Sequence, residues 1–257
     1  MKKVKWGQHF LRDKKILKKI AERIFQNLEK EKIKFIVEIG AGKGELTEFL
    51  LKNKKSSQLK ILAIEKEKKF CEILKKKFEK FKNLEIFCAD IRDFFNKYFF
   101  SQKLQNYLVC GNLPYFLAKD LILKFLEIKN PPKRMVFLVQ KEVGERICAK
   151  VPKMDFLSLK VQSQADVFFL MKIKKEKFSP RPKVDGALIE IFPKKKNFPQ
   201  EILKLAKLAF SQKRKILKNT LKNVPKEFLN KRPQELSLED WKKIWENEKR
   251  TCQKEKK

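Results

Sequence analysis

Apolar and polar positions follow two different rhythms along this chain. From about residue 35, short apolar runs alternate with charged stretches in which apolar residues recur every three or four positions. The runs predicted as strands are 35–39, 61–65, 84–89, 107–110, 135–139, 167–173 and 187–192. The stretches predicted as helices are 13–28, 45–51, 66–81, 119–128 and 142–149. Strands that alternate with helices are typical of a mostly parallel α/β sheet with helices on both faces.

The pattern changes toward the C-terminus. No helical stretch separates the last two predicted strands, so we expect an antiparallel pair at the edge of the sheet. After Pro193 the segments "PQEILKLAKLAFSQKRKILKNTLKNV" and "SLEDWKKIWENEKR" are helical and basic. We therefore expect two domains, an α/β domain over residues 1–193 and a small basic helical domain over residues 194–257.

The net charge of the chain indicates a class of binding partner. The chain has 64 Lys and Arg against 31 Asp and Glu, a formal net charge of +33. Such an excess favours a polyanion partner, most simply a nucleic acid. The alternative is compositional drift, because Lys, Phe and Ile are all used heavily. Charge alone indicates neither which nucleic acid is bound nor what is done to it.

Other features narrow the setting. There is no run of about 18 apolar residues and no apolar core after the N-terminal lysines, so we expect neither a membrane span nor a secretory signal. The five cysteines are odd in number and contain no C-x-x-C pair, so we expect unpaired thiols in a reducing compartment and no metal site. The protein is expected to be cytoplasmic.

A candidate cofactor site follows the first strand of the α/β domain. Gly40, Gly42 and Gly44 form a glycine-rich turn between a strand and a helix, where a ligand can approach the backbone closely. The next two strands end in Glu65 and Asp90, at the edge where open α/β sheets bind ligands. A phosphate-binding loop would need Ser or Thr after Lys43, and a nicotinamide site prefers G-x-G-x-x-G. S-adenosylmethionine therefore fits this pattern better than NAD.

The fourth strand brings a second chemical signal to the same edge, "NLPY" at residues 112–115. These are turn-forming residues, yet turn chemistry alone leaves Tyr115 without a role. The Asn112 side-chain oxygen and the Leu113 carbonyl can accept the two N–H bonds of an exocyclic amine. Pro114 stiffens the turn, and Tyr115 offers a ring on which a base can stack. This arrangement favours methyl transfer to a base amine, driven by positioning and without a metal.

In sequence order, these motifs resemble those of the small-subunit ribosomal RNA adenine dimethyltransferases, the KsgA/RsmA type. The resemblance runs from Gly7 to about Leu221. The matching segments are "GQHFLRD", "EIGAGKGELT", "IE", "AD", "GNLPY", "QKEV", "FSPRPKVDGALI" and "AFSQKRKILKNTL". It implies a Rossmann-like class I methyltransferase sheet with a small helical C-terminal domain, and S-adenosylmethionine as the cofactor.

The resemblance also implies residue roles. The implied cofactor contacts are His9, Leu11, Gly40, Gly42, Glu65, Asp90 and Asn112. Asp90 would receive the adenine amine and Glu65 the ribose, while Phe178 would stack on the target base opposite Tyr115. His9 is the only histidine; the family often carries Asn there, which argues against a proton-transfer role.

Basic residues in the matching segments are candidates for RNA contacts. They are Lys141, Arg181, Lys183, Lys213, Arg214, Lys215 and Lys218, the last four on a predicted helix. Two departures concern RNA docking. Gly186 stands where the family usually has Ser, and Phe116-Leu117-Ala118 replaces a polar run.

The implied function is dimethylation of the N6 amines of two adjacent adenines near the 3′ end of small-subunit (16S) ribosomal RNA, during small-subunit biogenesis. The expected partner is this RNA in an immature 30S-type subunit, with the enzyme acting as a monomer. One alternative is a large-subunit ribosomal RNA adenine methyltransferase of the antibiotic-resistance type. Another is a ribosome-assembly factor with vestigial catalysis, which the intact Asn112 motif and the two acids oppose.

Overall fold

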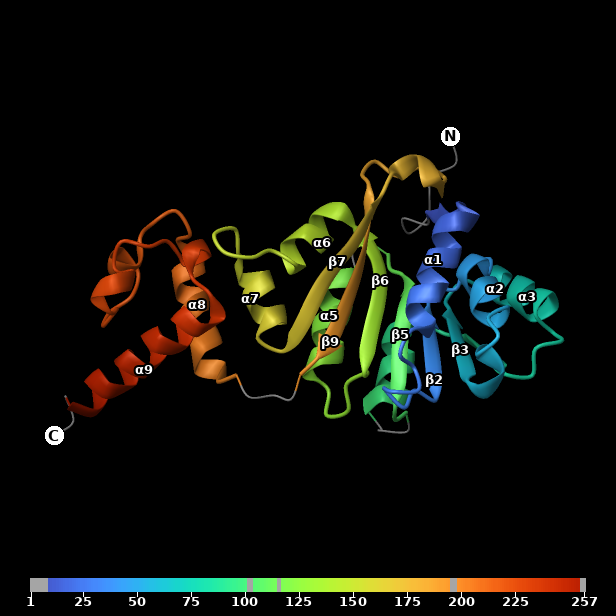
Figure 1. The fold of residues 1–257 in the computed structure, drawn as a ribbon, viewed down its shortest axis with the longest axis horizontal. Helices are drawn as coiled ribbons and strands as arrows, with labels where there is room; N and C mark the ends of the chain where they lie inside the picture. Colours follow the sequence, from blue (N-terminus) through green and yellow to red (C-terminus); the bar gives the residue numbers. More distant parts are fainter. Residues whose placement is uncertain (1–8, 101–103, 115–116, 195–197, 255–257) are drawn as a thin grey trace. The chain divides into compact units, whose positions relative to one another are not determined.

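A computed structural model describes residues 9–100, 104–114, 117–194 and 198–254 of the chain (Figure 1). The strands are β1 (Phe10–Leu11), β2 (Phe35–Ile39), β3 (Lys60–Glu65), β4 (Leu84–Cys88), β5 (Tyr107–Asn112), β6 (Arg134–Gln140), β7 (Ala165–Ile173), β8 (Phe178–Ser179) and β9 (Gly186–Pro193). The α-helices are α1 (Lys14–Phe25), α2 (Glu45–Leu51), α3 (Lys68–Lys77), α4 (Ile91–Phe94), α5 (Ala118–Glu127), α6 (Lys141–Ile147), α7 (Phe156–Gln162), α8 (Gln200–Ser211) and α9 (Leu238–Lys254). A π-helical turn, Phe95–Phe100, follows α4 directly.

A mixed sheet forms the centre of the fold. Its strand order is β4-β3-β2-β5-β6-β9-β7, and β4, β3, β2, β5 and β6 are mutually parallel. β9 runs antiparallel to β6, and β7 lies beside it at the edge of the sheet. The predicted α/β class is confirmed. The parallel order brings the carboxyl ends of β2, β3, β4 and β5 to one edge, where the glycine turn, the two acids and Asn112 follow.

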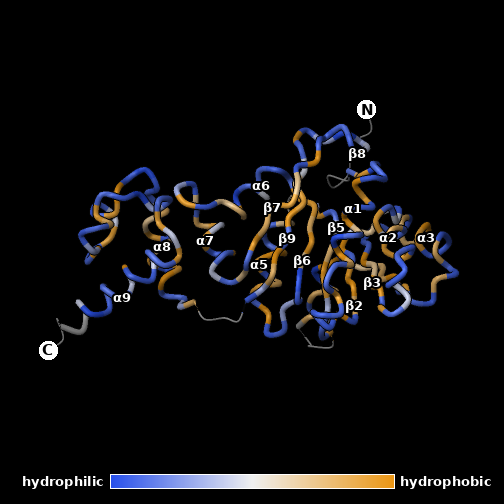
Figure 2. The backbone as a smooth tube through the Cα atoms, viewed as in Figure 1, coloured by the Kyte–Doolittle hydropathy of each residue, from blue (hydrophilic) through white to orange (hydrophobic). Residues whose placement is uncertain are grey.

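Apolar side chains cover both faces of this sheet. Alternate strand residues such as Ile36, Leu108 and Val136 join one core cluster with the buried face of α1. On the other face, rings after α4 pack against α5, as in the Phe95–Phe125 contact with centroids 5.0 Å apart. Figure 1 shows α1 and α5 on opposite sides of the sheet. Figure 2 shows hydrophobic positions along the central strands and hydrophilic positions over much of the helices. Two-sided burial explains the continuous apolar runs of these strands.

Two compact units divide the chain. One comprises Met1–Gly144 with Phe168–Pro193, and the other Glu145–Val167 with Lys194–Lys257. The second unit thus includes residues 145–167, which the sequence prediction assigned to the first domain. The reason is packing, because Met154 and Leu159 share a core cluster with Trp241 of α9.

One predicted helix is shorter than expected. The stretch around "AFSQKRKILKNTLK" leaves the α-helical conformation after Ser211, so Lys213–Lys215 lie in a turn and Lys218 in a 3₁₀ turn. Tertiary contacts account for the break. Leu217 is fully buried in the second core, and its backbone N–H donates to the Lys231 carbonyl at 2.8 Å. The prediction of a continuous basic helix was wrong.

The expectation that all cysteines are unpaired was also wrong. Cys71 of α3 and Cys88 at the end of β4 form a disulfide, with Cα atoms 5.9 Å apart. They are 17 residues apart in sequence and meet because the chain from α3 returns directly into β4. Cys110 and Cys148 are free thiols.

Candidate active site

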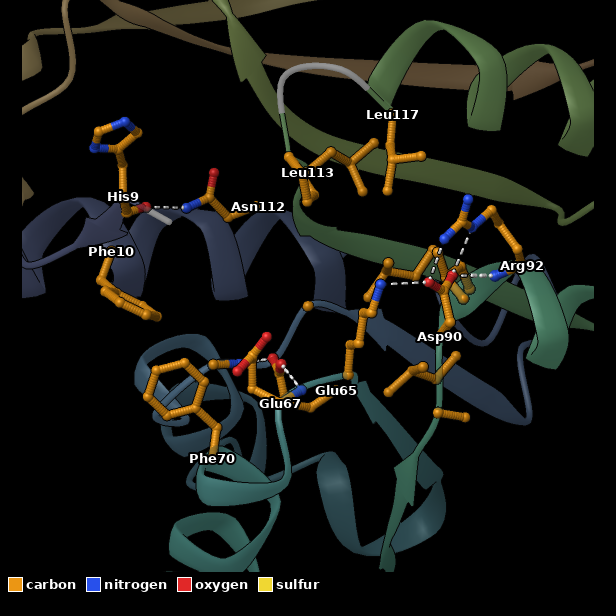
Figure 3. A pocket seen from close by; sticks show the side chains of 18 residues that line it. His9, Phe10, Glu65, Glu67, Phe70, Asp90, Arg92, Asn112, Leu113 and Leu117 are labelled. Atoms are coloured by element: carbon orange, nitrogen blue, oxygen red, sulfur yellow. Dashed lines mark hydrogen bonds and ion pairs between the residues drawn. The ribbon is translucent and has the colours of Figure 1, made fainter. Parts of the chain in front are cut away.

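A pocket of about 180 Å³ lies at the carboxyl ends of β2, β3, β4 and β5 (Figure 3). Its lining includes six of the seven predicted cofactor contacts: His9, Gly40, Gly42, Glu65, Asp90 and Asn112. Leu113 and Pro114 line it as well. Leu11 is buried and lines a smaller adjoining cavity instead. The structure therefore brings most of the predicted cofactor site together from four different strands.

The glycine turn shapes one wall of the pocket. Gly40 and Gly42 have φ values of 70° and 58°, a left-handed conformation that side-chain-bearing residues rarely adopt. A Cβ atom at Gly42 would lie 2.6 Å from the ring of Phe10, which also lines the pocket. At this wall, glycine is required both by the backbone conformation and by the close approach of Phe10.

The Glu65 carboxylate is held by the main chain. Its Oε2 accepts a hydrogen bond from the Gly42 N–H at 2.8 Å, and its Oε1 accepts one from the Glu67 N–H at 2.8 Å. Each oxygen keeps a further lone pair for a ligand hydroxyl. The carboxylate is thus fixed in the pocket wall as an acceptor, which suits a ribose diol.

Asp90 is held differently, by cations. It caps the N-terminus of α4, and its carboxylate pairs with the side chains of Arg92 and Lys66. The hydrogen bonds from Arg92, together with that from Lys66, hold the pKa of Asp90 well below its usual range. Asp90 is therefore ionised at neutral pH and remains an acceptor.

Asn112 stands at the end of β5, and its orientation follows from one contact. Its Nδ2 lies 2.7 Å from the His9 carbonyl oxygen. A carbonyl can only accept, so the amide nitrogen must face His9 and Oδ1 must point away from it, as Figure 3 shows. The turn after Asn112 is anchored too, because the Leu113 N–H donates to the Leu138 carbonyl at 3.0 Å. The side-chain oxygen of Asn112 is therefore oriented by a contact with a distant residue and not by a local motif.

The segment that orients Asn112 also contacts the loop that carries Phe178. β1 pairs antiparallel with β8, with Leu11 opposite Phe178. The His9 Nδ1 lies 2.7 Å from the Pro180 carbonyl oxygen, so this nitrogen carries the hydrogen. His9 thus serves as a hydrogen-bonded link at the pocket, and its lack of a general-base role stays a prediction.

Phe178 itself is buried, with 5% of its surface exposed. Gly186 makes this possible, because a Cβ atom there would lie 3.1 Å from the Phe178 ring. Stacking of Phe178 on a target base stays a prediction. Tyr115 lies outside the described residues.

The predicted RNA-contact residues lie at the surface, apart from Lys141. Lys183, Lys213, Arg214, Lys215 and Lys218 are exposed. Arg181 is exposed and pairs with Glu176, while Lys141 is half-buried at the start of α6. Their roles remain predictions.

Buried Glu38 adds a titratable group beneath the glycine turn. Its Oε2 accepts a hydrogen bond from the Thr47 hydroxyl at 2.6 Å, which connects β2 to α2. Burial raises the pKa of Glu38 to about 8, so it is largely protonated at neutral pH. It lines the smaller cavity and is not among the residues that line the main pocket.

Sequence reasoning missed several pocket residues, among them Phe10, Lys66, Phe70 and Arg92. Phe10 and Phe70 meet edge to face with centroids 5.5 Å apart. Phe10 lies inside the matching "GQHFLRD" segment, so proximity to that motif was an available signal. Arg92 and Lys66 adjoin the two predicted acids in sequence, yet a single lysine or arginine carries little information in so basic a chain.

Among the residues that the structure describes, no group of three or more His, Cys, Asp or Glu side chains is arranged to hold a metal ion. Within the same residues, no helix is both long and apolar enough to cross a membrane.

Comparison with known proteins agrees with this geometry. Residues 1–250 match the profile of the family described as Ribosomal RNA adenine dimethylase. A relative from Borreliella burgdorferi (strain ZS7), named Ribosomal RNA small subunit methyltransferase A, is 37% identical over 92% of this chain and 85% of its own length.

Two solved structures share the fold. A dimethyladenosine transferase from Plasmodium falciparum matches with a TM-score of 0.71 and 25% identity, covering 92% of this chain and 96% of that one. The 23S rRNA methyltransferase ErmE matches with a TM-score of 0.73 and 18% identity, covering 93% and 98%. At that identity the second likeness supports the class I methyltransferase fold alone. The chain belongs to the ribosomal RNA adenine dimethylase family.

Proposed function

We propose that this protein transfers methyl groups from S-adenosylmethionine to the N6 amines of two adjacent adenines near the 3′ end of small-subunit ribosomal RNA. The observation that carries the proposal is the hydrogen bond that orients Asn112, which lines the same pocket as Glu65 and has its side-chain oxygen turned away from His9. Family membership and the printed names of the relatives support the same reaction.

The pocket residues suit an S-adenosylmethionine cofactor. The left-handed glycine turn lets a ligand approach the backbone, and Glu65 can accept from ribose hydroxyls. Asp90 can accept from an adenine amine that displaces one of its contacts with Arg92 or Lys66. When bound, the cofactor supplies an electrophilic methyl group on a positively charged sulfur. His9 and Asn112 lie on the opposite side of the pocket from Glu65 and Glu67 (Figure 3). We expect the methyl-accepting amine to bind on the side of Asn112 and the β5 turn.

The chain's own chemistry is positioning. The lone pair of an adenine N6 amine is delocalised into the ring, and two acceptors draw the nitrogen toward tetrahedral geometry by binding its two hydrogens. Asn112 Oδ1 is one acceptor, and we assign the Leu113 carbonyl as the other. The Pro114 carbonyl is already engaged by the Leu117 N–H at 2.9 Å, which starts α5. With S-adenosylmethionine bound, these two acceptors would aim the nitrogen lone pair at the methyl group that the cofactor supplies, and the amine would release a proton to solvent.

The basic surface would dock folded RNA. Binding should weaken steeply with salt, since each neutralised phosphate releases counterions. A-form helices hide their base edges, so the target adenines must be loop bases that can leave the stack. We propose an immature small subunit as the substrate, bound by a monomeric enzyme in the cytoplasm, with Lys213, Arg214, Lys215 and Lys218 taking part.

The large-subunit alternative is not favoured, because the curated relative is named for the small subunit. A vestigial enzyme is opposed by the intact Asn112 arrangement.

The test is mass spectrometry of small-subunit ribosomal RNA nucleosides from cells with and without this protein. We expect N6,N6-dimethyladenosine to disappear from the 3′ region when the protein is removed. Unchanged dimethyladenosine would reject the proposed reaction. A parallel assay with purified protein should give far faster methylation of an immature subunit than of a short naked hairpin.

A further inference from the structure

The Asp90 carboxylate has no lone pair left over in the pocket. Its Oδ1 accepts from the Arg92 backbone N–H at 2.9 Å and from the Arg92 Nε at 3.0 Å. Its Oδ2 accepts from the Arg92 Nη2 at 2.7 Å and from the Lys66 Nζ at 3.0 Å. A carboxylate offers about four lone-pair sites, and all of them are in use. Any further donor must displace one of these contacts.

The displaceable contacts are those of the two cationic side chains. The backbone N–H of Arg92 belongs to the N-cap of α4, so it stays in place while the helix is intact. The side chains of Arg92 and Lys66 are 60% and 47% exposed, whereas that of Asp90 is 14% exposed. A side chain with that much exposure can turn into water at low cost.

Arg92 holds the larger share of the carboxylate. Its planar guanidinium contacts both oxygens at once, which Lys66 cannot do. Both side chains line the same pocket as Asp90, and Figure 3 shows the dashed contacts between Arg92 and Asp90 within that lining. A ligand amine at Asp90 therefore competes with the guanidinium for both oxygens.

We propose that Arg92 is a specificity-determining residue of the cofactor pocket: its guanidinium competes with the adenine amine for Asp90 and so weakens the preference for adenine over 6-oxopurines. The inference rests on the proposed function, because it assumes that an adenine nucleoside binds here.

The chemistry of the two bases explains the direction. Adenine presents an amine at position 6, which needs an acceptor. A 6-oxopurine presents a carbonyl there, which a bare carboxylate repels and a guanidinium can bind. With Arg92 present, adenine loses part of its acceptor and the 6-oxopurine gains a donor. Without the Arg92 side chain, each oxygen of Asp90 regains one lone pair for the base.

The size of the effect follows from the strength of exposed ion pairs. Such pairs contribute about 0.2–1 kcal/mol, which corresponds to at most about a fivefold change in a dissociation constant. We expect Arg92→Leu to bind adenosine about two- to fivefold more tightly than the unaltered protein. We expect the same variant to bind inosine no more tightly, so the adenosine-to-inosine preference rises.

The experiment measures dissociation constants of adenosine and inosine by competition with radiolabelled S-adenosylhomocysteine, at low and at high salt. Both nucleosides are uncharged, so the basic surface does not affect them directly. The gain for Arg92→Leu should shrink at high salt, because salt screens the competing pair in the unaltered protein. Arg92→Lys keeps the charge but loses the fork and should fall between the two.

Arg146→Leu is the matched control. Arg146 also pairs with an aspartate through its Nε, at 2.7 Å from Asp155 Oδ2, and its side chain is 50% exposed, but it lies in the other compact unit. It should leave both dissociation constants unchanged. Thermal melting verifies that each variant is folded.

The outcomes separate the two proposals. Weaker or equal adenosine binding in Arg92→Leu, with the variant folded, would overturn the role of Arg92 and leave the cofactor assignment intact. If neither adenosine nor S-adenosylhomocysteine bound the unaltered protein, the cofactor assignment would be wrong and this inference with it.

Discussion

The two halves of the pocket are built by different means. On the cofactor side, Glu65 is held by the N–H groups of Gly42 and Glu67, all within a short stretch of β2, β3 and the turns that follow. On the base side, Asn112 is held by the carbonyl of His9, which lies 103 residues away. The Glu65 carboxylate is therefore fixed by main-chain groups, whereas Asn112 depends on a distant segment. We therefore expect that separate substitutions can weaken cofactor binding and methyl transfer.

The strongest way to separate the halves is Asn112→Ala. The variant loses an acceptor that matters most as the amine becomes nucleophilic, so we expect methyl transfer to fall by about two orders of magnitude. RNA affinity should change little, because the backbone phosphates dominate it. Single-turnover methylation and RNA binding are measured on the same preparation, with the exposed Asn219→Ala as the control. Near-normal turnover would remove Asn112 from the mechanism.

Gly111→Ala and Gly40→Ala compare the backbone of the two halves. At Gly111, φ is 151° and a Cβ atom would lie 2.2 Å from the Ile39 carbonyl oxygen, which is backbone and cannot yield. We expect Gly111→Ala to lower the free energy of unfolding by about 3 kcal/mol. At Gly40 the nearest atom would be 3.6 Å away, so only the left-handed conformation costs energy, about 1–2 kcal/mol. Urea unfolding curves measure the free energy of unfolding of both variants. Equal losses would show that the clash at Gly111 adds no cost.

Glu65→Ala probes the cofactor half alone. The change removes a ligand acceptor and leaves the N–H groups of Gly42 and Glu67 without their carboxylate, so S-adenosylmethionine affinity should fall by roughly 1–3 kcal/mol. RNA affinity should survive, since no RNA contact is assigned to Glu65. Calorimetry with S-adenosylmethionine and with NAD is the measurement. Binding of NAD in place of S-adenosylmethionine would refute the cofactor assignment.

Glu38→Gln tests whether the buried Glu38 makes the folding stability of the protein depend on pH. Burial raises the Glu38 pKa from 4.5 to about 8, so the folded state binds a proton that the unfolded state releases in that range. The resulting stability is fully present below about pH 4.5 and is lost as the pH rises through 8. Each pKa unit is worth about 1.4 kcal/mol, so the loss is at most a few kcal/mol.

The measurement is the free energy of unfolding between pH 5 and pH 9 for both proteins. Gln keeps the acceptor for the Thr47 hydroxyl but cannot ionise, so its profile should be flatter over this range. Identical pH profiles would show that Glu38 does not titrate as its burial implies.

Much of this protein was determined by local sequence. Apolar runs of strand length, alternating with amphipathic stretches, predicted β2 within its observed bounds and the other sheet strands to within a few residues. The glycine turn and the acids at strand ends identified the cofactor edge, because parallel strands bring their carboxyl ends together. These signals are short-range, since hydrophobic periodicity and turn chemistry act over a few residues.

Tertiary structure decided which side chains and backbone groups contact one another. The link from His9 to Asn112, the Cys71–Cys88 disulfide and the contacts of Arg92 and Lys66 with Asp90 carry no periodic signal. The helix predicted across residues 209–222 ends at Ser211 because burying Leu217 in the second core outweighs helix propensity, which is worth only fractions of a kcal/mol per residue. Residues 145–167 likewise join the second unit because Met154 and Leu159 share its core. Packing energy is gained only once the chain is folded, so these features could not be read from the sequence.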